Sequence, residues 1–270
     1  MQLSRWAVLV TCGAWGLCPC PAQAWGATAQ RLVLLEAIES LPKGPKEFYK
    51  THRLELPTLA PEGQPPEDTA ERRFAIDRLV PFPFRDVPLA EEPFKARFGE
   101  EGTRIGRLPW LVQESYQRLV EAMKSGDSAR ILAESDMLAF LVAQMNNPLA
   151  LTDNADGQKT DQHGLWTRFT VRLPEAMGGR LKLQAEAARY LDDPRRYVGE
   201  MAVGGYVYAD NVLFEEALAK RGQAGFTELY YEAFERRAGK LLRERLSAAA
   251  TDVGSYWYTA WTVAGRPALK

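Results

Sequence analysis

The sequence predicts an all-α protein whose helices form a single domain. Apolar residues recur at helical spacing through most of the chain, and no segment shows the two-residue alternation of a half-buried strand. No repeat or low-complexity tract divides the sequence. We therefore expect residues 25–270 to form one multi-helix domain, which is long enough to bury a substantial core.

Residues 1–24 have the features of a signal peptide. An early arginine is followed by an apolar stretch too short to span a bilayer, and Ala22 and Ala24 form the small-residue pattern of a cleavage site. We expect cleavage after Ala24, export to the periplasm or the medium, and Trp25 as the mature N-terminus. Two alternatives are a cytosolic protein with an apolar start and a lipoprotein lipidated at Cys12.

The composition excludes several functions. All three cysteines, Cys12, Cys18 and Cys20, lie in the expected leader, so the mature chain has no disulfide and no thiolate for catalysis or metal binding. The formal net charge of −1 supplies no overall field that would attract nucleic acid or an anionic membrane. No later apolar run reaches transmembrane length, so we expect no membrane anchor once the leader is removed.

The first half of the domain is expected to contain several helices. Periodicity predicts them at residues 27–40, 46–53 and 69–79, with an irregular proline-rich loop over residues 54–68. A strongly periodic helix over residues 108–124 has a proline in its first turn, where the missing N–H matters least.

The second half continues the helical pattern. Asp127 or Ser128 is expected to cap a buried helix, which ends before Pro148 because proline disfavours helical geometry in the preceding residue. Residues 152–158 have turn chemistry, and another helix is expected to start at Gly164. The remaining expected helices cover residues 194–219, 227–249 and 254–261.

Three local patterns have simple structural interpretations. Gly204-Gly205 has no phosphate-loop pattern and predicts a bend or a close helix contact. The aromatic run in residues 256–261 could stack on bases or sugars, but we favour a buried helix–helix contact. The charged residues between 228 and 245 predict a solvated face.

Several motifs, in order along the chain, resemble a known family. They are Trp25-Gly26, residues 73–77, Pro109-Trp110, Pro148-Leu149, Thr152, Asn154, Gly157-Gln158, Thr160, Gln162, Gly164 and residues 254–261. This pattern is similar to the zinc-dependent phospholipase C and single-strand nuclease superfamily, especially its bacterial secreted branch. The resemblance implies the all-helical fold of that superfamily and a cluster of three zinc ions that activates water to attack a phosphate ester.

The resemblance also locates the metal ligands of the family, and this chain lacks their chemistry. The corresponding positions are Trp25, Gln30, Phe74, Phe140, Gln144, Ala150, Trp166 and Thr170. The resemblance implies that Trp25 contributes the amine and carbonyl of the mature N-terminus and that the other seven positions contribute side chains. Zinc takes nitrogen, sulfur or carboxylate ligands, and none of those seven residues is a usual zinc ligand. The pairs 140/144 and 166/170 have the i, i+4 spacing that places two residues on one helical face. We therefore expect no zinc and no other cofactor, and a former metal cavity refilled with apolar side chains.

His163 is the single catalytic candidate that remains beside the former site. It could act as a general base or a lone metal ligand, but we favour a loop histidine bonded to backbone or solvent. His52 is expected at a solvated helix end. Asp153, Asp156 and Asp161 could bind calcium in an exposed loop, but their spacing does not fit the EF-hand pattern and favours turn formation.

The sequence therefore supports three hypotheses. We favour an exported, catalytically inactive homologue of the superfamily that binds an unknown protein or small ligand, or has a structural role, in the cell envelope. The alternative is an active phosphoesterase that uses a reduced or relocated metal site, with His163 and the nearby aspartates as its residues. The third is an apolar-ligand binder that uses the emptied cavity beside Phe74, Phe140 and Trp166.

Overall fold

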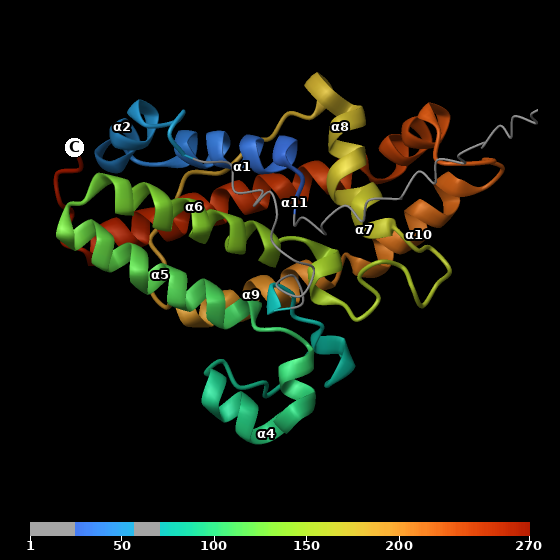
Figure 1. The fold of residues 1–270 in the computed structure, drawn as a ribbon, viewed down its shortest axis with the longest axis horizontal. Helices are drawn as coiled ribbons and strands as arrows, with labels where there is room; N and C mark the ends of the chain where they lie inside the picture. Colours follow the sequence, from blue (N-terminus) through green and yellow to red (C-terminus); the bar gives the residue numbers. More distant parts are fainter. Residues whose placement is uncertain (1–24, 57–70) are drawn as a thin grey trace, which may run out of the picture.

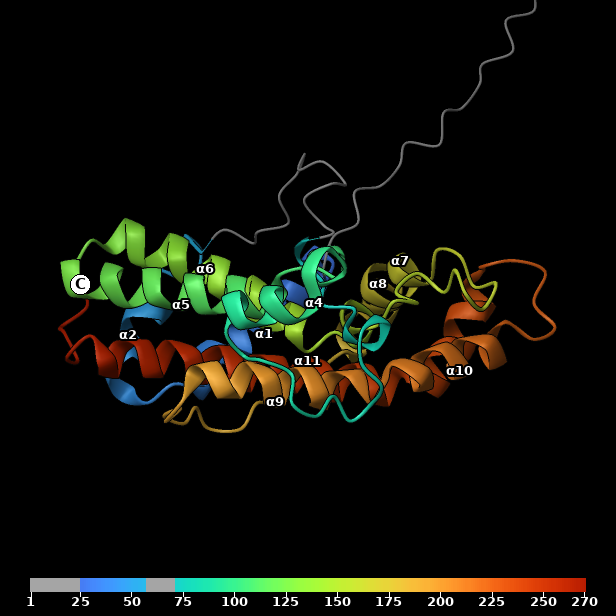
Figure 2. The ribbon, with the colours of Figure 1, turned by 90° about the horizontal axis from the view of Figure 1, so that it is seen from below.

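The long helix α11 (Glu228–Val263) organises the fold. In this computed structural model, residues 25–56 and 71–270 are described, and these residues are all-helical without a strand, which confirms the predicted fold class. Helix α1 (Ala27–Ser40) packs along α11, and α5 (Leu108–Ser125) and α6 (Ser128–Met145) form a second layer over it (Figure 1; Figure 2). The expected leader and most of the proline-rich loop lie outside the described residues.

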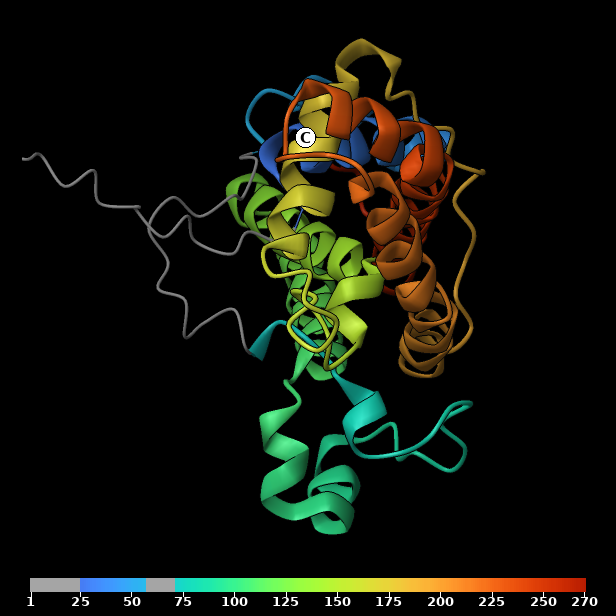
Figure 3. The same cartoon turned by 90° about the vertical axis from the view of Figure 1, so that its right-hand side faces the viewer.

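The other elements surround this pair of layers. Helix α4, which follows the largely irregular residues 71–90, projects away from the body of the molecule (Figure 3). The elements not yet given are α2 (Lys43–Thr51), η1 (Ile76–Arg78), α4 (Glu91–Arg104), η2 (Pro148–Leu151), α7 (Leu165–Thr167), η3 (Arg168–Arg172), α8 (Leu173–Met177), η4 (Gly178–Arg180), α9 (Pro194–Tyr206) and α10 (Ala209–Lys220).

Two helix predictions are wrong in the described part of the chain. A helix was expected over residues 69–79, but residues 72–79 contain only the short turn η1. The backbone there pairs over long range instead: Phe74 donates its N–H to the Ala150 carbonyl (2.8 Å) and Ala75 donates to Ile105 (2.9 Å). The single helix expected over 194–219 is two helices, α9 and α10.

Other predictions are confirmed in detail. The Asp127 carboxylate accepts the N–H of Arg130 (3.1 Å) and thereby caps α6, which ends at Met145. A Cβ added at Gly205 would meet Leu151 and the Met145 carbonyl, so the glycine permits the close helix contact that its position predicted.

The aromatic run near the C-terminus is buried, as predicted. Tyr256 and Trp257 are both fully buried in α11. The Trp257 indole donates to the Ser135 carbonyl (3.0 Å), and its ring stacks on Tyr49 with a centroid separation of 4.4 Å. These contacts join α2 and α6 to α11, so the run acts in the core rather than as an exposed stacking surface.

An extended strap, residues 181–192, lies against α1 and α11. Its backbone N–H groups donate to hydroxyl oxygens that recur every four residues along α11. The pairs are Gln184 with Ser247 (3.0 Å), Glu186 with Thr251 (2.9 Å), Arg189 with Ser255 (3.2 Å) and Leu191 with Thr259 (2.9 Å). Thr251, Ser255 and Thr259 also donate their own hydroxyl protons to carbonyls four residues earlier, so each hydroxyl is used as donor and acceptor.

Helices α1 and α11 and the strap meet at Gly254. A Cβ added there would meet the Ser40 hydroxyl oxygen, the Ala37 carbonyl and the Ala188 side chain. Two of these three neighbours belong to α1, and the third belongs to the strap. Only a residue without a side chain allows this approach.

We predict that Gly254→Ala lowers the free energy of unfolding by about 1–3 kcal/mol, because the added methyl group overpacks this junction. Chemical denaturation would measure the change. Gly204→Ala is the matched control: that helical glycine has no atom within 4 Å of an added Cβ. The control should be neutral or more stable by up to about 1 kcal/mol, since alanine favours helix. A Gly254→Ala protein as stable as the native one would contradict the packing argument.

Candidate functional site

The eight positions where the resemblance places metal ligands are all buried, and two of their segments meet at Trp25 and Gly26. The Trp25 indole donates to the Ala143 carbonyl (2.8 Å), beside Gln144 on α6. The Gly26 N–H donates to the Thr170 carbonyl (3.0 Å) in η3. The start of α1 is therefore joined to the two helices that carry most of the other positions.

Four of the positions, Phe74, Phe140, Gln144 and Ala150, make further contacts. Phe74 and Ala150 are paired through the backbone, as described above. The Asn147 amide donates to the Gln144 side-chain oxygen (3.2 Å). The Arg72 guanidinium lies over the Phe140 ring, 5.2 Å from its centroid.

These side chains do not fit a zinc cluster. Phe74, Phe140, Ala150 and Trp166 offer no ligand atom of the kinds that zinc prefers. The Thr170 hydroxyl donates to the Trp166 carbonyl (2.8 Å), so it is bonded within its own helix, which contains the π turn η3. Within residues 25–56 and 71–270, no three His, Cys, Asp or Glu side chains are grouped to hold a metal ion.

Gln30 is a buried polar residue in this region. It is 1% exposed, and neither atom of its amide has a hydrogen-bond partner among the described residues. Burying an amide without hydrogen-bond partners costs free energy of folding. The buried Gln144 avoids part of this cost, because its side-chain oxygen accepts a hydrogen bond from Asn147. Gln30 therefore reduces the stability of the fold.

His163 lies outside this buried group. Its side chain is exposed, and its carbonyl accepts a hydrogen bond from Arg168 (2.6 Å). His52 lies at the end of α2 with its ring nitrogen 3.1 Å from the Glu55 carboxylate. Neither histidine lies in the buried group.

The loop before α7 uses its motif residues for its own structure. The two oxygens of Asp156 accept the N–H groups of Gly164 (2.8 Å) and Trp166 (3.0 Å), which confirms a turn-forming role for this aspartate. Gly157 has a φ of +72°, and an added Cβ would collide with Gln162. Asp153 instead pairs with Lys159 (2.6 Å).

Sequence reasoning missed a buried ion pair that holds this loop against α10. Arg168 and Glu216 are 2.9 Å apart and nearly fully buried. Glu216 also accepts hydrogen bonds from Gln162 (2.6 Å) and from the Tyr230 hydroxyl (2.8 Å). Glu216 follows Arg168 by 48 residues, so no local sequence spacing predicts the pair.

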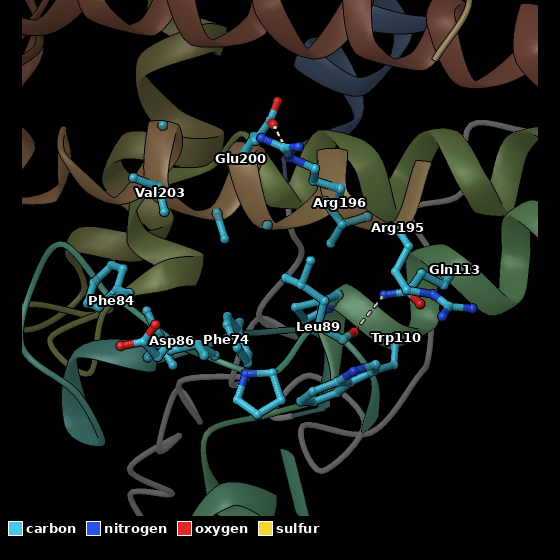
Figure 4. Close-up of a pocket in the computed structure, with 18 residues that line it drawn as sticks. Phe74, Phe84, Asp86, Leu89, Trp110, Gln113, Arg195, Arg196, Glu200 and Val203 are labelled. Atoms are coloured by element: carbon cyan, nitrogen blue, oxygen red, sulfur yellow. Dashed lines mark hydrogen bonds and ion pairs between the residues drawn. The ribbon is translucent and has the colours of Figure 1, made fainter. Parts of the chain in front are cut away.

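An elongated pocket of about 730 Å³ borders Phe74 and is the candidate binding site (Figure 4). Aromatic side chains form one wall: the Phe74 and Trp110 rings lie edge to face, with centroids 5.7 Å apart. Helix α9 forms the opposite wall through Val198 and Val203. Leu89 projects into the space between the two walls. The volume and the apolar lining are typical of small-molecule sites.

Hydrogen-bond donors lie at one end of this pocket, apart from the Arg196–Glu200 pair on α9 and from Asp86. Figure 4 shows Trp110, Gln113 and Arg195 at that end and Asp86 at the other. Trp110 is 5% exposed, and its indole N–H has no hydrogen-bond partner in the described part of the chain. The Gln113 amide donates weakly to the Leu89 carbonyl (3.4 Å).

A separate buried carboxylate joins three helices. Asp252 on α11 accepts hydrogen bonds from the Tyr197 hydroxyl of α9 (2.6 Å) and from the Asn146 amide at the end of α6 (2.8 Å). Burial raises the pKa of Asp252, although these two hydrogen bonds and the more distant Arg189 and Arg245 oppose the increase.

The comparisons with known proteins leave the family assignment a proposal. No protein-family model matches the sequence, and no curated protein is significantly similar to it. Among the described helices, none is both long and apolar enough to cross a membrane.

We predict that Gln30→Met raises the free energy of unfolding by about 1–3 kcal/mol, because it removes an unpartnered amide and keeps a similar volume. Gln144→Met is the control, and it should be destabilising because it leaves the Asn147 amide without its acceptor. Denaturant titration of both variants tests the contrast, and a destabilised Gln30→Met protein would show that the amide has a favourable partner.

Asp252 predicts a pH dependence of stability. Because its folded pKa is raised, its stabilising contribution is full below the ordinary aspartate pKa of about 3.9 and is lost as pH rises through the folded value. Asp252→Asn should therefore flatten the fall in melting temperature above about pH 4. Thermal melts of both proteins across this range would measure it, and identical pH profiles would contradict the assignment.

Proposed function

We propose that this protein is an exported, non-catalytic binding protein built on a scaffold like that of the zinc-dependent phospholipase C and nuclease superfamily. The observation that carries the proposal is the chemistry at the eight positions where the resemblance places metal ligands. Their side chains are buried, and four of them are Phe, Phe, Ala and Trp. A cluster that activates water needs imidazole and carboxylate ligands instead.

The contacts around these positions support a structural role for the former site. Trp25 anchors α1 on α6, Phe74 pairs with Ala150, and Thr170 bonds within its own helix. Loss of the metal together with all of its ligands is physically coherent, because carboxylates left without their metal would be costly to bury.

The pocket beside Phe74 supports a binding function. It is large enough for a small molecule, and its walls are apolar apart from a few convergent polar groups. Such a lining binds by burial of apolar surface and orients its ligand through the polar end. Of the two carboxylates among the described residues that line it, Glu200 pairs with Arg196 (3.2 Å) and Asp86 lies at the opposite end (Figure 4), an arrangement that supports binding.

Metal content and hydrolytic activity test this proposal. We expect protein purified from the periplasm or medium of expressing cells to contain less than one zinc ion per chain after dialysis against zinc-containing buffer. It should also leave phosphodiester and phosphomonoester substrates uncleaved, with and without added zinc. Elemental analysis and product assays measure both quantities.

The controls separate this proposal from the phosphoesterase alternative. Stoichiometric zinc together with chelator-sensitive cleavage would overturn a non-catalytic function. If cleavage occurs, His163→Ala tests the relocated site, and His52→Ala is the matched control because that ring lies beside Glu55 at the end of α2.

A further inference from the structure

We propose that the pocket between α5 and α9 binds a single-chain amphiphile with a carboxylate head, such as a medium- or long-chain fatty acid. This inference rests on the proposed binding function and names the ligand class. The apolar chain would lie between Phe74 on one wall and Val198 on the other, beside Leu89, and the head would lie at the end occupied by Trp110 and Arg195.

Two of the three hydrogen-bonding side chains at that end favour an acceptor, and the third, Gln113, already donates to Leu89. The Trp110 indole and the Arg195 guanidinium can donate hydrogen bonds but cannot accept them. The indole N–H is buried in the pocket wall and has no partner within the described residues, so a ligand oxygen that reached it as the ring adjusts would satisfy a donor that is otherwise costly to bury. An ionised carboxylate is an acceptor-only group that matches this set.

The charges around the pocket also favour an anion at this end. Arg196 is neutralised by Glu200 (3.2 Å), whereas the described residues give Arg195 no such carboxylate partner. Asp86 lies at the opposite end, where Arg97 donates a hydrogen bond to its backbone carbonyl. Among the described pocket residues, Arg195 is thus a cation without a carboxylate at ion-pair distance, and this asymmetry would orient an anionic head toward it.

The long apolar wall accounts for the chain. Val198 is 1% exposed and Phe84 is 7% exposed, so both side chains are backed by the core and shape the pocket rigidly. Leu89 reaches across to α9, where an added Cβ at Gly199 would lie 2.7 Å from its Cδ2. The glycine therefore lets Leu89 approach α9, and a side chain at position 199 would push Leu89 into the pocket.

Calorimetric titration with saturated fatty acids from octanoate to tetradecanoate, each below its micelle concentration, tests the chain. Affinity should rise about fourfold for each added methylene until the pocket is filled. Gly199→Leu should reduce dodecanoate affinity at least tenfold, whereas Ala217→Leu, at an exposed position on α10, should not change it. Affinity that is independent of chain length, or that survives Gly199→Leu in a folded protein, would overturn the proposal.

A second comparison tests the head group. Trp110→Phe keeps an aromatic wall and removes the N–H, so it should weaken dodecanoate binding about tenfold and dodecanol binding less. Arg195→Gln should reduce the preference for dodecanoate over dodecanol by up to about fivefold, and Arg221→Gln, which removes a cation away from the pocket, should preserve it. Equal losses for both ligands would overturn the assignment of the head group.

The outcome can be separated from that of the proposed function. A metal-free, inactive protein that binds none of these fatty acids would overturn the ligand class alone. A zinc-loaded, hydrolytic protein would overturn the non-catalytic function whatever the titrations show.

Discussion

The close approach of α1 to α11 at Gly254 is the constraint on which the rest of the structure depends. A side chain at this position would separate the two helices and displace the strap that crosses them. Because the interior of a protein is close-packed, such a separation would spread to the elements packed on both helices. Trp257, one turn further along α11, then fixes α6 and α2 against the same helix.

This arrangement also positions both candidate regions. Helix α1 brings Trp25 and Gly26 to α6 and η3, so the positions suggested by the resemblance are joined by the scaffold itself. Phe74 links them to the pocket, since its backbone pairs with Ala150 while its ring faces Trp110. The chain has thus kept a close-packed interior at one side of Phe74 and an open apolar site at the other.

The sequence predicts the helices whose apolar spacing or caps are strong, such as α1, α5 and α6, because those signals are local. The prediction fails at residues 69–79, because long-range backbone pairing of Phe74 and Ala75 replaces the expected helix. It also does not anticipate α4, whose helical pattern is interrupted by the non-helical Gly99. The polar end of the pocket could not be predicted, because Trp110 and Arg195 are brought together only by the packing of α5 on α9. The absence of histidines at the expected ligand positions, in contrast, needs no structure.

The strap on α11 has a consequence for how the molecule meets other chains. Four residues of α-helix advance about 6 Å and two residues of extended backbone advance about 6.6 Å, so hydroxyls at every fourth helical residue can pair with alternate N–H groups of an extended segment. The steps from Gln184 to Glu186 and from Arg189 to Leu191 have this spacing, and the step between the two pairs is one residue longer. The N–H groups of Ala185 and Ala188, between those bound to α11, are taken by Glu36 and Ser40. Most N–H groups of this extended segment are thereby paired although it belongs to no sheet, which leaves fewer donors for pairing with a strand of another molecule and for aggregation.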